Sequence, residues 1–455
     1  MTRLFGTNGI REVVGDPLTA TYVGRIAAAI GGVVPPGRPI AVGWDGRTSS
    51  PAFARIVSAT LSLAGHRVIE VGLLPTPAIQ YNVPRLAAAA GVIVTASHNP
   101  PEFNGVKCIG PDGLEAPREF EEAVEAAVER GADRGVPFDQ VGEVDPDHLG
   151  ARRYLDGILA RVDRERIGQR RFSVVLDCAN GAGAVTSPVL LRRLGCRTVT
   201  INGSIDGTFP GHPPEPTEAH LADLKRTVVA IGADLGVAHD GDADRAIFVD
   251  ASGRYVPGEE MLALMARDAV EQHGHGVVVT SISSPSTVEE AVVAAGGTVE
   301  YTRVGSPAIT RAMQDRQAVF GGEDNGGLIV PGFQLARDGA MAVAAVLDLL
   351  ARKERSLPDL LRELPHSSVL KEKVACPVAL RERVMARAKD RLAAGAERVV
   401  TIDGLKVYRD QGSLLIRPSG TEPLLRVFAE AKDPSTARAL ADLGLATVRE
   451  AIASQ

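Results

Sequence analysis

The sequence predicts an α/β protein with three related α/β domains in tandem, built on mixed, mainly parallel sheets, and a small α+β domain at the C-terminal end. Its 455 residues suffice for three or four domains. One pattern occurs three times: an apolar run, a polar turn, a helical stretch, a glycine and a second β-rich run. Such strand–helix–strand units imply parallel strands joined by right-handed crossovers. The paired runs are RPIAVGWD with AGHRVIEVG, RFSVVLDCANG with LGCRTVTING, and GVVVTSISS with AGGTVEYTRVG.

The tail of the chain follows a different pattern. VVTIDGLKVYRDQGSLLIRP and LLRVFAEAK are typical of adjacent strands joined by short turns. A helix is expected from Pro434 to about Ile452, with Asp433 as its N-cap. Strands followed by a helix indicate an α+β domain. The expected domains are 1–150, 151–252, 253–366 and 367–455.

Composition excludes several classes of partner. A net charge of -6 provides no general field for attracting nucleic acid or an anionic membrane. The four cysteines form no Cys-x-x-Cys pair, which indicates buried thiols in a reducing compartment. The opening MTRLFGTNGIR lacks an apolar signal core, and the stretch from Leu86 to Val94 is too short to span a bilayer. We therefore expect a cytoplasmic protein with a small-molecule partner, and a homo-oligomer stays open.

Ser97 lies in the first cluster that could do chemistry, TASHNPPEFNGVK. This segment follows the apolar run GVIV and so begins at the end of a buried strand, where ligands of α/β sheets usually bind. Two prolines after Ser97 stiffen the loop. The alternative is a rigid turn with a capping serine and a surface lysine at Lys107.

The second cluster, AHDGDADR, holds Asp240, Asp242 and Asp244. In an extended segment this i, i+2, i+4 spacing directs the three carboxylates to one side. One such pair at 4 Å costs about 4 kcal/mol at an effective dielectric of 20, and a hard divalent cation removes that cost. Magnesium is the leading choice because it suits phosphate chemistry. A solvated acidic turn is the alternative, and an EF-hand calcium loop would need a Glu where Ala251 falls.

Two further loops could bind a sugar phosphate. FGGEDNGGLIVP offers Glu323 and Asn325 for sugar hydroxyls, or else is a glycine-rich turn. RPSGTEP, from Arg417 to Pro423, combines an arginine, two hydroxyls and open backbone N–H groups, which suits a phosphate. A hairpin connection with a chance arginine is the alternative for this loop.

Together these clusters resemble the α-D-phosphohexomutase family, which includes phosphoglucomutases, phosphomannomutases and phosphoglucosamine mutases. GTNGIR, TASHNP, DGDADR, GEDNGG and RPSGTEP stand in the order of the family's motifs along the whole chain. The resemblance implies four domains around a central cleft. They would carry the phosphoserine loop, the metal loop, the sugar-binding loop and the phosphate-binding loop in turn.

The resemblance also implies roles for single residues. Ser97 would be phosphorylated and, with the three aspartates, would coordinate one Mg²⁺. Arg11, His98 and Lys107 are the candidate catalytic residues beside it, and a sugar bisphosphate would be the intermediate and activator. The expected substrate-binding residues are Arg245, Glu323, Asn325, Arg417, Ser419, Gly420 and Thr421.

Two departures from the family pattern affect these roles. Asn325 and Gly327 stand where several relatives carry Ser and His, so a general-base role for that His does not transfer. Ser306 stands where relatives often carry Asp or His, which puts the usual ligand contact there in doubt. The Asn-Gly-Gly form is similar to archaeal members.

The mechanism implied is an exchange of phosphate between C6 and C1 of one hexose. Phosphoserine 97 would donate to the free hydroxyl, the bisphosphate would reorient, and Ser97 would take back the other phosphate, with Lys107 moving the hydroxyl proton. The opening LFGTNGIR resembles the phosphoglucosamine mutase branch, and a glucose/mannose enzyme is the alternative. More remote alternatives are a phosphoserine-type phosphatase and a non-catalytic sugar-phosphate sensor.

Overall fold

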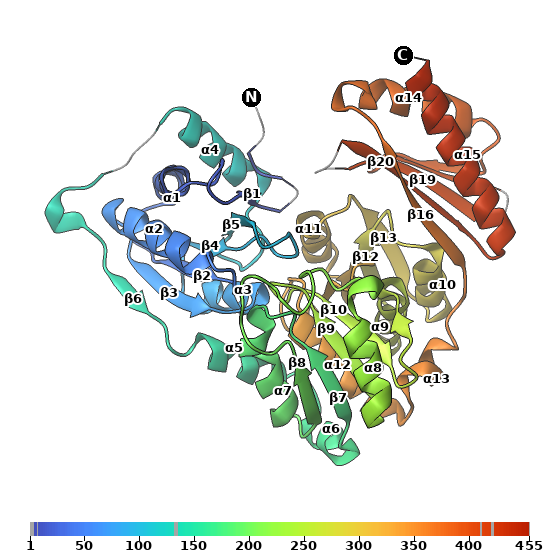
Figure 1. Ribbon diagram of the computed structural model, residues 1–455, viewed down its shortest axis with the longest axis horizontal. Helices are drawn as coiled ribbons and strands as arrows, with labels where there is room; N and C mark the ends of the chain where they lie inside the picture. The colour runs from blue at the N-terminus through green and yellow to red at the C-terminus, as the bar shows by residue number, and fades with distance from the viewer. Residues whose placement is uncertain (1–3, 7, 132–134, 410–411, 420–422, 455) are drawn as a thin grey trace. The chain divides into compact units, whose positions relative to one another are not determined.

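The computed structural model describes residues 4–6, 8–131, 135–409, 412–419 and 423–454. The chain forms two compact units, of which one comprises Met1–Met261 with Asn325–Arg362 and the other Leu262–Asp324 with Glu363–Gln455. Across the described residues, no helix is both long and apolar enough to cross a membrane. The first of these units contains a six-stranded and a five-stranded sheet, and the second contains most of a four-stranded sheet and another five-stranded sheet (Figure 1).

The first sheet has six strands in the order β1-β5-β4-β2-β3-β6. β2 pairs in parallel with β3, as the first strand–helix–strand repeat predicts, and also with β4, whereas β5 pairs antiparallel with β1 and β4. Its central strands are continuous buried runs, typical of sheets covered on both faces. The strands are β1 Ile10–Val13, β2 Ile40–Trp44, β3 Val68–Leu73, β4 Ala90–Val94, β5 Phe103–Ile109 and β6 Val144–Pro146.

Helices α1, α2 and α4 pack together on this sheet (Figure 1). Thr19 caps α1 by accepting a hydrogen bond from the N–H of Tyr22, and the apolar side chains of α1 and α2 enter one core with β2 and β4. The helices of this region are α1 Ala20–Val33, α2 Ser50–Leu63, α3 Thr76–Arg85, α4 Arg118–Glu129 and the short η1 Phe138–Gln140.

The second sheet has five strands in the order β11-β10-β9-β7-β8. β7 is parallel to β8, as the second repeat predicts, and also to β9, and β10 returns antiparallel to β9. The strands are β7 Ser173–Asp177, β8 Arg197–Ile201, β9 Leu235–His239, β10 Ala246–Asp250 and β11 Tyr255–Val256. The helices are α5 Gly150–Leu159, α6 Arg164–Arg170, η2 Ala182–Val185, α7 Ser187–Arg193, η3 Glu218–His220, α8 Ala222–Ile231 and α12 Gly339–Lys353. Helix α9, Gly258–His273, begins in this unit, and its residues from Leu262 on belong to the other.

An aromatic cluster joins the two sheets of this unit. The rings of Tyr81 and Phe333 stack at 4.7 Å, and Tyr154 lies 5.8 Å from Tyr81. The buried Tyr154 hydroxyl donates to Asp338, which also caps α12, so burial of the rings is coupled to the start of that helix. The strand ends that carry the candidate site are thereby fixed relative to one another.

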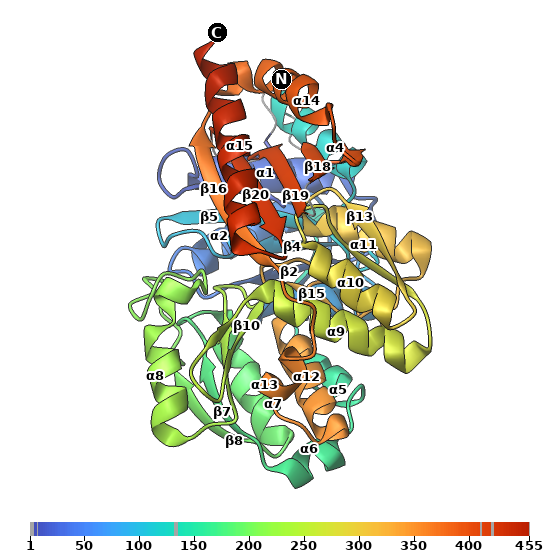
Figure 2. The ribbon, with the colours of Figure 1, turned by 90° about the vertical axis from the view of Figure 1, so that its right-hand side faces the viewer.

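The other unit contains a parallel and an antiparallel sheet. β12 is parallel to β13, as the third repeat predicts, and also to β14. The second sheet is antiparallel in the order β16-β20-β19-β18-β17, and α15 lies across it (Figure 2). The elements are β12 Val277–Ser281, α10 Ser286–Ala294, β13 Thr298–Thr302, α11 Ser306–Arg316, β14 Phe320–Gly322, β16 Ser368–Ala375, η4 Val378–Leu380, α14 Arg381–Ala393, β17 Arg398–Val400, β18 Leu405–Arg409, β19 Gly412–Pro418, β20 Leu424–Ala431 and α15 Pro434–Ala453.

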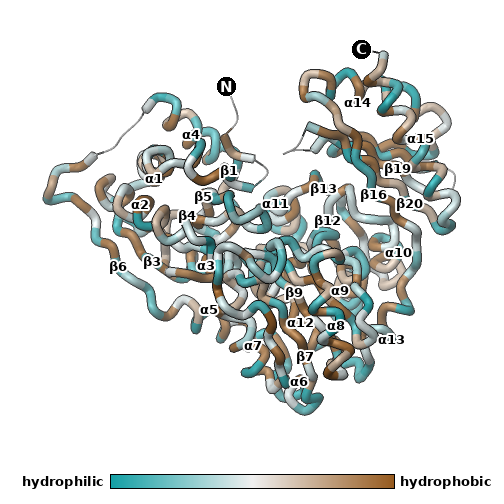
Figure 3. The backbone as a smooth tube through the Cα atoms, in the orientation of Figure 1, coloured by the Kyte–Doolittle hydropathy of each residue, from teal (hydrophilic) through white to brown (hydrophobic). Residues whose placement is uncertain are grey.

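The predicted C-terminal domain is confirmed in its main features. Asp433 caps α15 by accepting the N–H of Thr436 at 2.8 Å, and the hydrophobic strands β19 and β20 form its core with that helix (Figure 3). Strand β16, at the start of the predicted 367–455 domain, pairs with β20 and extends the sheet beyond the strands expected from the sequence. The remaining short elements of the chain are β15 Leu328–Ile329 and α13 Leu357–Leu361.

Candidate active site

Ser97 lies in the connection between β4 and β5, as its position after an apolar run predicts. The residue is fully buried and has a left-handed backbone, with φ of 51°. Such a conformation costs a non-glycine residue about 1–3 kcal/mol unless its surroundings hold it. Its N–H donates to Thr95 Oγ1 at 2.8 Å, and its carbonyl accepts from Arg47 at 2.8 Å. Both main-chain polar groups of Ser97 are therefore fixed by side chains.

Asp240, Asp242 and Asp244 converge in the connection between β9 and β10. All three are buried, and one carboxylate oxygen from each lies within 4.8 Å of the other two. The convergence was expected from an extended segment, and that part of the prediction is wrong. The segment is a turn in which Ala243 has a left-handed φ of 55°, so the turn gathers the side chains.

The Ser97 hydroxyl faces this aspartate cluster. Its Oγ donates to Asp240 Oδ2 at 3.2 Å, across 143 residues of sequence. Gly241 allows this approach, because a Cβ there would lie 2.6 Å from the Ser97 carbonyl oxygen. The two loops therefore touch main chain to main chain, and the Ser97 hydroxyl and the acidic groups share one buried space.

Cationic side chains compensate the three carboxylates. Lys107 Nζ lies 2.9 Å from Asp242 Oδ2, and Arg337 Nη2 lies 2.5 Å from Asp244 Oδ2. Burial by itself would raise the pKa of Asp242, but the charge and hydrogen bond of Lys107 outweigh it and hold that pKa below its ordinary value. Burial, with the charges of Asp244 and Asp242, raises the pKa of Asp240 well above its ordinary value.

Two oxygens of the aspartate cluster fit a metal ion. Asp242 Oδ1 and Asp244 Oδ1 are buried and have no hydrogen-bond partner among the described residues. A buried acceptor left unsatisfied is costly, and oxygen ligands are those that hard divalent cations prefer. The aspartate triad therefore has the donor chemistry and the unpaired oxygens that a divalent cation needs.

Arg245 and His98 lie next to the serine. Arg245 donates from its main-chain N–H to Asp240 and from Nη2 to His98 Nδ1 at 3.0 Å. The charge of Arg245, with burial, lowers the pKa of His98 far below its ordinary value, so the ring is neutral at physiological pH. Ser97 Oγ lies 3.3 Å from the same Nδ1. Arg11, on β1, donates to the side chain of Asn99 in the serine loop at 3.0 Å.

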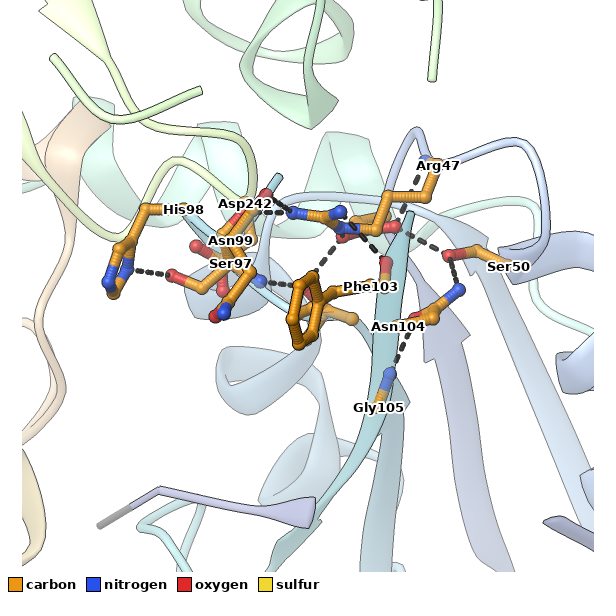
Figure 4. Close-up of polar contacts among 12 residues, drawn as sticks. Arg47, Ser50, Ser97, His98, Asn99, Phe103, Asn104, Gly105 and Asp242 are labelled. Carbon is orange, nitrogen blue, oxygen red and sulfur yellow. Dashed lines mark hydrogen bonds and ion pairs between the residues drawn. The ribbon is translucent and has the colours of Figure 1, made fainter. Parts of the chain in front are cut away.

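Three residues of this site were missed by sequence reasoning. Arg47 donates to carbonyls of the serine loop (Figure 4), Thr76 donates to Asp242 Oδ2 at 2.7 Å, and Arg337 pairs with Asp244. Arg47 could have been found from the sequence, because the polar DGR that begins at Asp45 directly follows a buried strand, just as the serine loop does. Thr76 and Arg337 stand in sequences without a local polar cluster and give no such signal.

The sugar- and phosphate-loop candidates lie in both units. In the second unit, the buried Glu323 accepts the N–H of Gly305 at 3.1 Å, and Asp403 pairs with Arg417 at 3.0 Å. Ser419 is buried there, whereas Gly420 and Thr421 lie outside the described residues. In the first unit, Asn325 Oδ1 accepts the N–H of Gly327 at 3.1 Å.

The fold and the site are those of a phosphohexomutase, and the chain belongs to the phosphoglucomutase/phosphomannomutase family. Models of that family match nearly the whole chain, with three α/β/α domains followed by the C-terminal domain. They match residues 2–134 (domain I), 152–253 (domain II), 257–368 (domain III) and 374–443 (C-terminal domain).

The chain is similar to archaeal enzymes over its full length. It is 39% identical to a probable phosphoglucosamine mutase of Methanopyrus kandleri, with 99% of each chain covered. It is 37% identical to a phosphoglucomutase/phosphomannomutase of Thermococcus kodakarensis, covering 99% of this chain and 100% of that one. A crystal structure of a family member from Burkholderia thailandensis superposes with a TM-score of 0.87 at 26% identity, covering 99% of this chain and 98% of that one.

Gly241→Ala tests the close approach of the two loops. The added Cβ meets the Ser97 carbonyl and must push the serine away from the aspartates. We expect kcat for hexose phosphate interconversion to fall about 10²-fold, the cost of a displacement near 1 Å at a reacting group. Gly32→Ala is the matched control, because no atom lies within 4 Å of a Cβ there. Equal activity of the two variants would contradict the conclusion that activity depends on the close approach of the Ser97 loop to the aspartate turn.

Proposed function

We propose that this enzyme interconverts glucosamine 6-phosphate and glucosamine 1-phosphate through a phosphorylated Ser97 and a bisphosphorylated sugar. One observation carries the phosphoserine assignment: a buried serine hydroxyl lies 3.2 Å from a carboxylate of a three-aspartate cluster. A hydroxyl in that place can carry a phosphoryl group whose oxygens face a cation held by the aspartates.

The first half-reaction follows from the groups around Ser97. The O–P bond to Ser97 breaks and the Ser97 oxygen takes up a proton, while the free sugar hydroxyl loses its proton and forms the new O–P bond. Lys107 is our candidate for moving that proton, because it is buried against the aspartate cluster beside the serine. Mg²⁺, when bound by Asp240, Asp242, Asp244 and the phosphoserine, supplies neutralisation of the developing charge. In the second half-reaction Ser97 takes back the other phosphate.

Two positive groups next to the serine loop, Arg245 and Arg11, would guide the phosphate. Arg245 reaches His98 and lies 3.7 Å from Asp240 Oδ2, so its charge borders the space next to the serine. Arg11 holds Asn99 in the same loop. Since its Nδ1 accepts from Arg245, the neutral His98 ring can donate a hydrogen bond from its other nitrogen to a phosphate oxygen without adding a charge.

The phosphate that is not transferred would bind at Arg417, Ser419, Gly420 and Thr421. Arg417 is already held by Asp403, which also accepts the N–H of Val304, so the guanidinium is fixed in place. Glu323 fixes the next N–H, that of Gly305. These contacts fix the Arg417 guanidinium and the Gly305 N–H, and Glu323 and Asn325 would each contact sugar hydroxyls, as in the family motif.

The glucosamine assignment rests on the names of the relatives. Several similar curated relatives carry phosphoglucosamine mutase names, including those of the Methanopyrus and Pyrococcus proteins. The Thermococcus relative, similar to the same degree, carries a phosphoglucomutase/phosphomannomutase name. That similarity favours glucose and mannose phosphates as the second candidate substrates.

Ser97→Ala tests the phosphoserine. Because the hydroxyl carries the transferred group, we expect mutase activity to fall by at least about 10³-fold. Loss of the hydrogen bond from the Ser97 hydroxyl to Asp240 should lower the free energy of unfolding by only about 1 kcal/mol. The measurement is the rate of isomer formation, with inorganic phosphate release followed in parallel.

Ser58→Ala is the control, because it removes a buried hydroxyl from α2, outside the serine loop. That hydroxyl has no hydrogen-bond partner among the described residues. Intact mass of the wild type should show one phosphate that Ser97→Ala lacks. Full turnover by Ser97→Ala would overturn the mechanism, and phosphate release faster than isomer formation by the wild type would indicate a phosphatase.

Asp240→Asn tests the metal. Losing one of three carboxylates weakens divalent-cation binding, and we expect the Kd for Mg²⁺ to rise about 10- to 100-fold. Titration calorimetry measures this directly, and EDTA should abolish wild-type activity. Asp206→Asn, at an exposed turn, should bind Mg²⁺ like the wild type. Undiminished turnover in EDTA would refute the metal assignment.

Comparing three substrates tests the specificity. Glucosamine, glucose and mannose 1-phosphates differ at C2, and kcat/KM for each measures how the enzyme distinguishes them. We expect glucosamine 1-phosphate to have the highest kcat/KM, by about 10-fold or more. A preference for glucose or mannose 1-phosphate would replace the glucosamine assignment and leave the phosphoserine mechanism intact.

A further inference from the structure

Arg47 makes an unusual set of contacts with the serine loop. The side chain is buried, and its terminal nitrogens donate to four main-chain carbonyls, those of Ser97, Asn99, Pro100 and Phe103, at 2.5–2.9 Å (Figure 4). These two nitrogens have four N–H groups between them, one for each carbonyl. Arg47 therefore has no terminal N–H left for a phosphate.

The charge of Arg47 is balanced by its neighbour Asp45. The Arg47 Nε lies 3.2 Å from Asp45 Oδ2, and Asp45 Oδ1 accepts the N–H of Arg47. The same Asp45 Oδ2 accepts the Thr95 hydroxyl at 2.6 Å, and Thr95 Oγ1 accepts the Ser97 N–H. Since Arg47 holds the Ser97 carbonyl, both main-chain groups of Ser97 lead back to Asp45.

This closed set of contacts surrounds the left-handed residue of the loop. Ser97 has φ of 51°, a conformation that persists only where neighbouring groups determine it. The Phe209 ring lies 5.1 Å from the Arg47 guanidinium carbon and covers its face, and Phe209 also lies beside Gly241 of the aspartate turn. The contacts of Arg47 thus determine where the Ser97 hydroxyl points relative to Asp240.

We propose that Arg47 is a positioning residue for phosphoryl transfer, acting through the main chain of the Ser97 loop and not through the substrate. The inference rests on the proposed role of Ser97. A planar guanidinium is required, because a lysine has one nitrogen with three donors and cannot serve four carbonyls in this arrangement. Substitution should therefore lower kcat and leave KM for the sugar phosphate nearly unchanged.

Arg47→Lys is the conservative test, and Arg38→Lys is its matched control. Arg38 also donates to main-chain carbonyls, those of Ala87 and Ala88, but is exposed on the same domain. We expect Arg47→Lys to lower kcat about 10²-fold with KM within about twofold, and Arg38→Lys to match the wild type. The rate at which dephosphorylated enzyme takes a phosphoryl group from glucose 1,6-bisphosphate, followed by intact mass, should fall in parallel with kcat.

A second measurement separates positioning from general stability. In Arg47→Ala, millimolar guanidinium chloride should restore part of kcat by occupying the vacated place. The same addition should leave the wild-type kcat nearly unchanged and should restore no activity to Ser97→Ala. Thr95→Val, which removes the contact on the other side of Ser97, should lower kcat without raising KM and keeps the test available where Arg47→Ala does not fold.

Three results would overturn the inference: wild-type kcat in Arg47→Lys, a rise in KM that accounts for the loss, or loss of activity that follows thermal unfolding and is not restored by guanidinium. Ser97→Ala, assayed alongside, distinguishes the two levels of the argument. Wild-type mutase activity in Ser97→Ala would refute the proposed phosphoserine mechanism itself. An inactive Ser97→Ala with a fully active Arg47→Lys removes only the role of Arg47.

Discussion

The site depends on the burial of three carboxylates in one turn. Two unit charges 4 Å apart repel by about 4 kcal/mol at an effective dielectric of 20, so the turn can form only where positive charge reaches it. That charge comes from Lys107 on β5, from Arg245 at the end of the turn and from Arg337 before α12. Formation of the turn therefore requires the first sheet, the second sheet and the segment before α12 to be in place.

The serine is placed by a separate but connected set of contacts. The end of β2 supplies the Asp45 and Arg47 side chains, and the end of β4 supplies Thr95. These two neighbouring parallel strands together fix the serine loop that follows β4. The hydroxyl of Ser97 then reaches the aspartate turn at the end of β9. Three strand ends thus produce one arrangement, as expected for α/β sheets, where polar loops gather at the carboxyl ends of the strands.

The sequence predicts most of the fold and the centre of the site, because both depend on local patterns. Buried strands are continuous apolar runs, and the Ser97 and aspartate loops are polar clusters directly after them. Thr76 and Arg337 could not be predicted in this way, since their partners lie 166 and 93 residues away and single side chains leave no pattern. The prediction of an extended conformation from Asp240 to Asp244 was wrong because Ala243 adopts a left-handed backbone conformation.

The absence of a side chain at position 241 limits how this enzyme can diversify. The main chains of the serine loop and the aspartate turn are already in contact there, so a larger residue cannot be accommodated by a rotamer change. Sequence drift in either loop must preserve that contact, whichever sugar is bound. Directed evolution of new substrate preferences is therefore better aimed at segments remote from this junction, where side chains can be enlarged without moving the two loops apart.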